Sequence, residues 1–164
     1  MRTLTMDLPE DWVRYPVDGF HLVAAAPVTG SAENWAGAPG PNAAPTAREP
    51  ELAPSIMATT YAGEPAGLCG VDRLYVVEDV TCTVGGYPAR RMDLTRWTGR
   101  NNIFTRRWLV QQALAEGRAT LEISASCLIS DYEHFTAVFD AVIASAWFTP
   151  DEVSAESAPL RAVA

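Results

Sequence analysis

A thiol and an imidazole are the two side-chain types in this sequence that can combine for nucleophilic catalysis. Cys127 and His134 lie close together in the chain, and a cysteine becomes reactive when a neighbouring base removes its proton. Alternation of apolar residues directs Cys127 toward an apolar face, and His134 stands beside the apolar Phe135. We therefore interpret Cys127 as a buried, inert thiol and His134 as a partly exposed histidine, not as a catalytic dyad.

Metal and cofactor sites are recognised in sequences by the fixed spacing of their ligands. The remaining histidine and cysteines of the sequence are His21, Cys69 and Cys82. Together with Cys127 and His134 they do not show the ligand spacing of any known metal site. The glycine-flanked serine of hydrolases and the glycine-rich phosphate loops are also missing from the sequence. We expect no catalytic residue, no metal and no cofactor, and we predict that the protein is not an enzyme.

A mixture of charged residues and one tryptophan is predicted to share one face of an antiparallel sheet. Strict alternation assigns this polar face to Arg91, Asp93, Trp97, Arg107 and Glu122. Tight turns place Asp93 opposite Arg107 and Arg107 opposite Ser124. Exposed ion pairs contribute typically below about 1 kcal/mol each, so a solvated face is the simplest interpretation. Because Trp and Arg are enriched at binding hot spots, the same residues are the candidates for a partner-binding patch.

The segment 29–54 differs in composition from the rest of the chain. It is rich in Pro and Ala and cannot hold a regular element, because Pro offers no amide donor. Trp35 lies in this loop and is a further candidate for anchoring the loop or a partner. We predict one domain over residues 1–150 that carries this loop, followed by a flexible tail at 151–164.

Charge and hydropathy narrow the class of partner. The chain of 164 residues has a net charge of −8, which disfavours nucleic acid because phosphate backbones are held by clustered cations. No segment reaches the roughly 20 apolar residues of a membrane span, and the first residues lack the apolar run of a signal peptide. We expect a cytoplasmic protein without membrane insertion.

The elements that must position these residues are most legible in the second half of the chain. Gly85-Gly86 is the signal of a two-residue hairpin, and strands are predicted over 81–84, 87–97, 102–112 and 118–128. Alternation assigns the core face of this meander to Met92, Leu94, Phe104, Trp108, Val110, Leu121, Ile123, Ala125 and Cys127.

An amphipathic helix follows the last strand. Ser130 and Glu133 have the spacing of a capping box, which predicts that the helix begins there and ends near Trp147. Its apolar residues recur at helical spacing and form a stripe of Phe135, Val138, Phe139, Val142, Ile143 and Ala146. We predict an α+β fold in which this helix packs on the apolar side of the sheet.

The order of these elements resembles the Mog1/PsbP-like superfamily. The resemblance rests on the opening 8–12 (LPEDW), the hairpin 84–90 (VGGYPAR), Trp108-Leu109-Val110 in a long strand, and a last strand that leads into the helix. The superfamily includes mycobacterial lipoproteins, a Ran-binding protein, an extrinsic photosystem protein and chaperones of secreted effectors. It implies an α/β/α sandwich without shared catalytic residues and a role in binding proteins or small ligands.

Two functional hypotheses remain open at this point. The first is a non-enzymatic protein-binding module, an adaptor or chaperone-like accessory of a bacterial assembly or secretion system, with a homo-oligomer through the same face as a variant. The second is a helix-grip-like domain that binds a small apolar ligand between the helix and the sheet. Phe104, Trp108, Phe135 and Phe139 are large enough to fill such a cavity, which favours the first.

Overall fold

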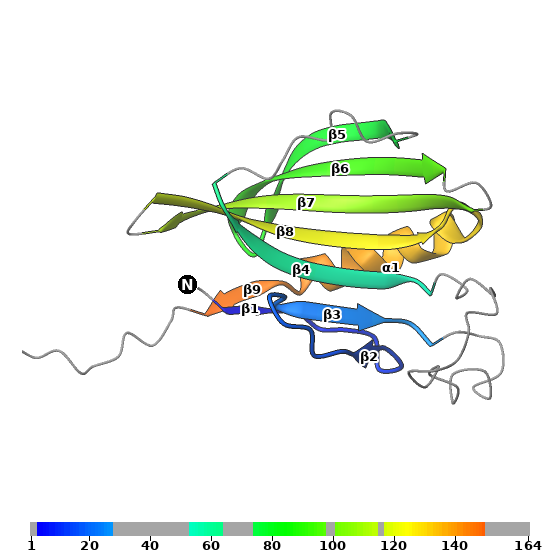
Figure 1. Ribbon diagram of the computed structural model, residues 1–164, viewed down its shortest axis with the longest axis horizontal. Coiled ribbons are helices and arrows are strands. Elements are labelled where there is room, and N and C mark those ends of the chain that lie inside the picture. The colour runs from blue at the N-terminus through cyan, green and yellow to red at the C-terminus, as the bar shows by residue number, and fades with distance from the viewer. Residues whose placement is uncertain (1–2, 28–52, 64–73, 98–100, 115–116, 150–164) are drawn as a thin grey trace, which may run out of the picture.

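A seven-stranded antiparallel sheet dominates the computed structural model, which describes residues 3–27, 53–63, 74–97, 101–114 and 117–149. The strand order is β2-β3-β4-β8-β7-β6-β5 (Figure 1). The strands are β2 (Val13–Arg14), β3 (Leu22–Ala25), β4 (Ser55–Ala62), β5 (Leu74–Val84), β6 (Tyr87–Trp97), β7 (Asn102–Leu114) and β8 (Gly117–Leu128). A separate two-stranded sheet joins β1 (Thr3–Thr5) to β9 (Trp147–Thr149).

The meander of β5 to β8 follows the predicted turns closely. Val84 pairs with Tyr87 across Gly85 and Gly86, whose φ angles of 55° and 81° suit the left-handed positions of a two-residue hairpin. The strand β6 has the predicted bounds, and β7 and β8 meet at a second tight turn where Leu114 pairs with Gly117. The predicted strand at 81–84 is part of a longer strand, because β5 begins at Leu74.

One α-helix, α1 (Tyr132–Ala144), is found in the described ranges, and it packs on one face of the large sheet behind β8 and β4 in Figure 1. Phe139, Val142 and Ile143 are its buried residues, in agreement with the predicted stripe. The α+β class and the C-terminal helix packed on an antiparallel sheet are thus confirmed. In the part of the chain that the structure describes, no helix has the length and apolar character needed to cross a membrane.

The predicted capping box is wrong. Residues Ile129–Asp131 form a 3₁₀ turn, η2, and Asp131 is the N-cap of α1 with no hydrogen bond from its side chain to the helix. The Ser130 hydroxyl donates to the Asp131 carboxylate at 3.2 Å instead of reaching the amide of Glu133. The 3₁₀ turn moves the start of the α-helix past Ser130, so the spacing of Ser130 and Glu133 no longer corresponds to a helix N-terminus.

The two faces of the large sheet are set by the register of its strands. The side that α1 covers, here called the helix face, carries Phe104, Trp108, Val110, Leu121, Ile123, Ala125 and Cys127, as predicted. Trp12 joins this core and contacts Phe139 edge to face, with ring centroids 6.4 Å apart. The other side, here called the reverse face, carries Arg107 and Glu122. The register places Met92 and Leu94 on the reverse face too, contrary to the prediction.

Candidate functional site

The strand β6 is turned over relative to the prediction. Trp97 pairs with Asn102, which places Asp93 opposite Arg106 and not opposite Arg107. Side chains alternate between the faces, so this shift of one residue moves Arg91, Asp93 and Trp97 to the helix face. The predicted pairing of Arg107 with Ser124 is confirmed. The predicted polar face is therefore divided, and Trp97 and Arg107 lie on opposite sides of the sheet.

A buried ion-pair network connects the helix face to α1. Arg106 donates from Nε to Oδ1 of Asp93 at 2.8 Å and from Nη2 to Oδ2 at 2.7 Å. Its Nη1 donates to both carboxylate oxygens of Asp140 on α1, each at 2.8 Å. Arg106 and Asp93 are almost fully buried, whereas Asp140 is half exposed. One arginine therefore links β6, β7 and the helix through charge-assisted bonds.

The electrostatics of Arg106 agree with a structural role. The hydrogen bonds to the Asp93 carboxylate raise the pKa of Arg106 above its usual value. This effect is larger than that of burial, which lowers the pKa, and larger than that of Asp140. Arg106 also lies over the ring of Phe104, 5.8 Å from its centroid. Both carboxylates that face Arg106 serve as its acceptors, so the arginine and the two aspartates are hydrogen-bonded to one another.

Arg91 continues the row of charges toward the edge of the sheet. It donates from Nη2 to Glu78 on β5, and its Nε lies 3.8 Å from Oδ1 of Asp93. This Nε is buried and has no hydrogen-bond partner in the ranges that the structure describes. Arg91 therefore bridges the buried Asp93 and the exposed Glu78.

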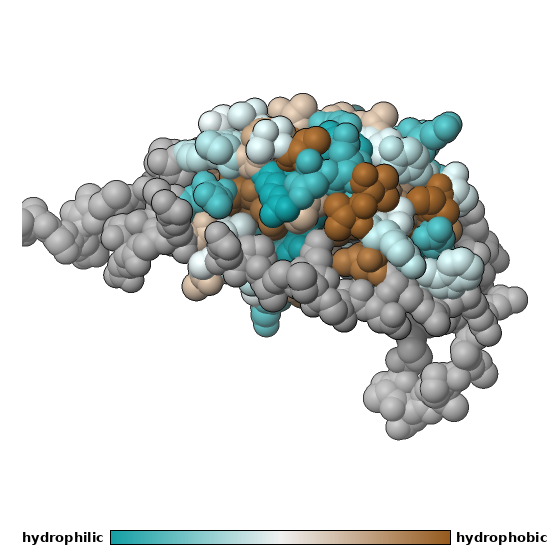
Figure 2. All heavy atoms as spheres, turned by 90° about the horizontal axis from the view of Figure 1, so that it is seen from above, coloured by the Kyte–Doolittle hydropathy of each residue, from teal (hydrophilic) through white to brown (hydrophobic). Residues whose placement is uncertain are grey.

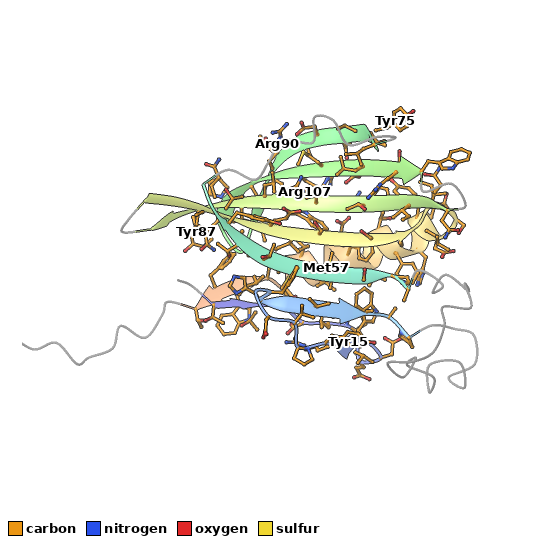
Figure 3. All side chains as sticks on the ribbon, viewed as in Figure 1. Tyr15, Met57, Tyr75, Tyr87, Arg90 and Arg107 are labelled. Atoms are coloured by element: carbon orange, nitrogen blue, oxygen red, sulfur yellow. The ribbon has the colours of Figure 1, made fainter. Side chains whose placement is uncertain are left out.

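The reverse face carries a second, smaller polar cluster. Arg107 donates to Glu122 at 2.6 Å, and the Ser124 hydroxyl donates to the same carboxylate at 2.9 Å. Burial, followed by the charge of Glu122, raises the pKa of Tyr61 on the neighbouring strand β4. Met57 on β4, Ser124 on β8 and Arg107 on β7 form one row across the reverse face, and Figure 3 shows Arg107 in the middle of β7. Arg107 and Glu122 are both nearly buried, so this pair is less accessible than a solvated charge ladder would be.

Exposed aromatic residues gather at one end of the helix face. Tyr75 pairs with Thr95, and Thr95 pairs with Phe104, so these three residues form one row across β5, β6 and β7. Trp97 is two residues beyond Thr95 on the same face. Tyr132, at the start of α1, contacts Phe104 edge to face, with ring centroids 4.6 Å apart. Figure 3 shows Tyr75 at the end of β5 that lies beside the C-terminal end of β6.

We call Tyr75, Trp97 and Tyr132 the aromatic patch. Their exposed fractions are 66%, 56% and 37%, although each has a large apolar ring. Phe104, which contacts Tyr132, is buried in the core. The patch therefore presents apolar surface to water next to the ion pairs of Arg91 and Asp93.

Cys127, His134 and His21 lie apart from the charged clusters, each in its own surroundings. Cys127 is buried in the core, and burial together with the charge of Asp131 raises the pKa of its thiol to about 11. His134 is exposed and packs edge to face on Phe135. His21 shares a hydrogen bond of 2.8 Å with Thr60, and burial lowers its pKa. In the described ranges no group of His, Cys, Asp and Glu is arranged to hold a metal ion.

Two of the predicted candidates lie outside the described residues, and three relevant residues were missed. The first group is Trp35 and Cys69, and residues 29–52 of the predicted loop and the predicted tail at 151–164 also lie outside the described residues. Arg106, Asp140 and Tyr75 belong to the second. A signal for Arg106 was present, because alternation places this charge on the apolar face between Phe104 and Trp108. No comparable signal marked Tyr75, whose row depends on the bulge in β5 between Val76 and Glu78.

Comparison with known proteins supports the fold. No family model matches the chain, and no curated protein matches it. The structure is similar to LpqN, which is involved in cell envelope biogenesis of Mycobacterium tuberculosis, with a TM-score of 0.66, 14% identity, and coverage of 92% of this chain and 85% of that chain. It is also similar to a protein of Bacteroides thetaiotaomicron, with a TM-score of 0.51, 12% identity, and coverage of 91% of this chain and 46% of that one. At these identities the likenesses show a shared α+β fold.

Proposed function

We propose that the protein is a non-enzymatic protein-binding module that holds its partner on the aromatic patch. The observation that carries this proposal is the exposure of Tyr75 and Trp97, which occupy diagonal positions on the neighbouring strands β5 and β6 at the end of one sheet face. Rings of this size stabilise a complex when a partner removes them from water, and Tyr and Trp are over-represented among the residues that dominate binding energy.

The charged residues near the patch support binding without turnover. Asp93, Arg106 and Asp140 satisfy one another, and Arg91 is paired with Glu78. Such pairs hold the shape of the surface and contribute polar groups at its rim, where interfaces are usually polar. Arg107 and Glu122 lie on the reverse face, so we assign them to the stability of the sheet and not to this docking surface.

The rival hypothesis of an internal ligand cavity has less support. Phe104, Trp108 and Phe139 come together in the core between the sheet and α1, where a helix-grip cavity would lie. Large buried rings at this position are typical of a filled core.

The cellular role is also a proposal. Likeness to a protein involved in cell envelope biogenesis supports an accessory role in a bacterial assembly, and the order of elements supports membership of the Mog1/PsbP-like superfamily. We propose that the protein acts in the cytoplasm, on partners that it delivers or holds there. Fractionation of the native host tests this location, and recovery in the envelope fraction would contradict it.

Cross-linking from the patch tests the docking surface. A photoreactive amino acid replaces Trp97 in the full chain, and a control places it at Trp147, which is also an exposed tryptophan but lies on β9. We expect a discrete adduct with one partner from position 97 and none from position 147. The identified partner is then purified, and Trp97→Ala should weaken its binding about tenfold or more, whereas Trp147→Ala should not. Equal effects of the two substitutions would remove the patch from consideration.

A further inference from the structure

Among the strands of the described ranges, β5 is the outermost on its side of the sheet. It runs from Leu74 to Val84 and pairs with β6 along one edge. At the opposite end of the sheet, β2 spans only Val13–Arg14. Figure 2 looks onto the β5 side of the molecule and shows hydrophobic residues directly beside strongly hydrophilic ones. A long outer strand is the part of a sheet where a further strand can be added.

The hairpin determines which backbone groups of β5 point away from β6. Residues that flank a two-residue turn exchange both backbone hydrogen bonds, so Val84 and Tyr87 form such a pair. Bonded and non-bonded pairs then alternate along the strand. Asp79, Thr81 and Thr83 therefore direct their N–H and C=O groups to the outer edge. Pro88, opposite Thr83, agrees with this assignment, because it occupies a position where the β5–β6 ladder needs no donor.

The side chains near this edge favour an apolar partner. Tyr75, Val76 and Val77 are large, consecutive and more than half exposed. Beyond them, Glu78 pairs with Arg91 and Asp79 pairs with Arg90, and both arginines lie on β6. The edge thus offers backbone donors and acceptors, an apolar end, and the exposed carboxylate of Asp79 in the middle of the strand.

We propose that β5 receives an extended segment of a partner protein, which adds to the sheet as an eighth strand and reaches the aromatic patch at Tyr75. This inference rests on the proposed function and specifies how the partner binds. Only an extended polypeptide supplies alternating donors and acceptors at the spacing of a strand, which excludes a compact small ligand for this edge.

Charge argues against a second copy of the chain as the occupant. In an antiparallel β5–β5 pair with full overlap, Asp79 lies directly opposite Asp79, since it is the middle residue of the strand Leu74–Val84. Like charges in this position are destabilising, and each chain carries a net charge of −8. The segment therefore comes from a different protein and carries apolar residues opposite Val76 and Val77.

A displayed library of linear peptides of about twelve residues, selected on the full chain, provides the probe. Selected peptides are measured against Thr81→Pro, which removes an outward N–H, and against Thr81→Ala, which keeps it. We expect Thr81→Pro to lower peptide affinity about tenfold or more and Thr81→Ala to change it little. Thr83→Pro repeats the test at the next outward position, and circular dichroism confirms that each variant is folded. Amide exchange should show new protection at Asp79, Thr81 and Thr83 when peptide is bound.

Several outcomes would overturn the inference. These are failure to select any peptide, selected peptides that bind both proline variants as well as Thr81→Ala, and a dimer that Thr81→Pro dissociates, which would make a second copy the occupant. The proposed function is tested separately by the partner cross-linked from position 97. If that partner still binds Thr81→Pro but not Trp97→Ala, the binding module stands and strand addition fails.

Discussion

Asp93 and Arg106 face each other across β6 and β7 and are joined by two parallel hydrogen bonds of 2.8 and 2.7 Å on the buried side of the sheet. Arg106→Ala leaves the Asp93 carboxylate buried without its main partner. Removal of one partner from a buried pair typically costs about 3–5 kcal/mol, and we expect a loss of this size in the free energy of unfolding.

The matched control for Arg106 is an exposed ion pair between β5 and β6 of the same sheet. Arg90 pairs with Asp79 near the surface, and Arg90→Ala should cost at most about 1 kcal/mol. Urea denaturation of both variants measures the difference. Similar losses for the two substitutions would show that the Arg106 network is no more important than a surface pair.

Alkaline pH should destabilise the protein through Cys127. Burial raises the pKa of this thiol to about 11 in the folded state, from 9.0 for an ordinary cysteine. The unfolded chain therefore loses the proton first, so the free energy of unfolding falls as the pH rises from 9.0 toward about 11 and is unaffected by this group below that window.

Comparison with a variant isolates the contribution of the Cys127 thiol. Cys127→Ala should show a shallower loss of stability than the natural chain when unfolding is measured at about pH 8 and about pH 10.5. The sequence contains no lysine, so the comparison is free of a side-chain type that commonly titrates in this range. An identical pH dependence of both proteins would mean that Cys127 keeps an ordinary pKa.

The two glycines of the β5–β6 hairpin should respond differently to alanine. A Cβ at Gly85 would lie 2.7 Å from the Phe148 ring and 3.0 Å from the carbonyl oxygen of Ala146, whereas a Cβ at Gly86 meets nothing within 4 Å. Both positions have positive φ, which costs an alanine roughly 1 kcal/mol. Gly85→Ala carries an additional steric cost of about 1–3 kcal/mol, so its thermal midpoint should be clearly lower than that of Gly86→Ala. Equal midpoints would contradict the close packing of Phe148 on the turn.

Substitution of a buried and of an exposed tryptophan should change the free energy of unfolding by very different amounts. Trp12 is 8% exposed and packs on Phe139, so Trp12→Ala should cost about 3–5 kcal/mol of unfolding free energy. Trp97 is 56% exposed, and Trp97→Ala should change stability by about 0.5 kcal/mol or less. Chemical denaturation checks both values. A large loss for Trp97→Ala would mean that this residue supports the fold, which would weaken its assignment to a docking surface.

Much of the fold was predictable because its signals are local. The strand β6 has the predicted bounds, Gly85-Gly86 forms the predicted turn, and the apolar stripe of the helix is buried through Phe139, Val142 and Ile143. Each of these features depends on residues that are close in the chain, where periodicity and glycine conformation determine the outcome. The predicted capping box is not formed, because a short 3₁₀ turn at Ile129–Asp131 precedes the α-helix and Ser130 lies within that turn.

The candidate site was less predictable, because the face of β6 depends on pairing across a turn. Met92 and Leu94 are apolar and Arg91 and Asp93 are charged, so hydropathy alone assigns the first pair to the core face. The structure places the charged pair there instead, where Arg106 and Asp140 compensate Asp93. Burial of a charge is tolerated when its partners are present, and these partners come from β7 and α1.

The sequence by itself determined the order of the strands β5 to β8 and of α1 and the apolar side of β7 and β8, because these follow from spacing along the chain. Only the tertiary structure decided that Trp97 lies with Tyr75 and not with Arg107. Side chains on a strand alternate with a period of two, so a register shift of one residue reverses the face, and that register is set by how β6 pairs with β7 and by the partners that Asp93 finds there.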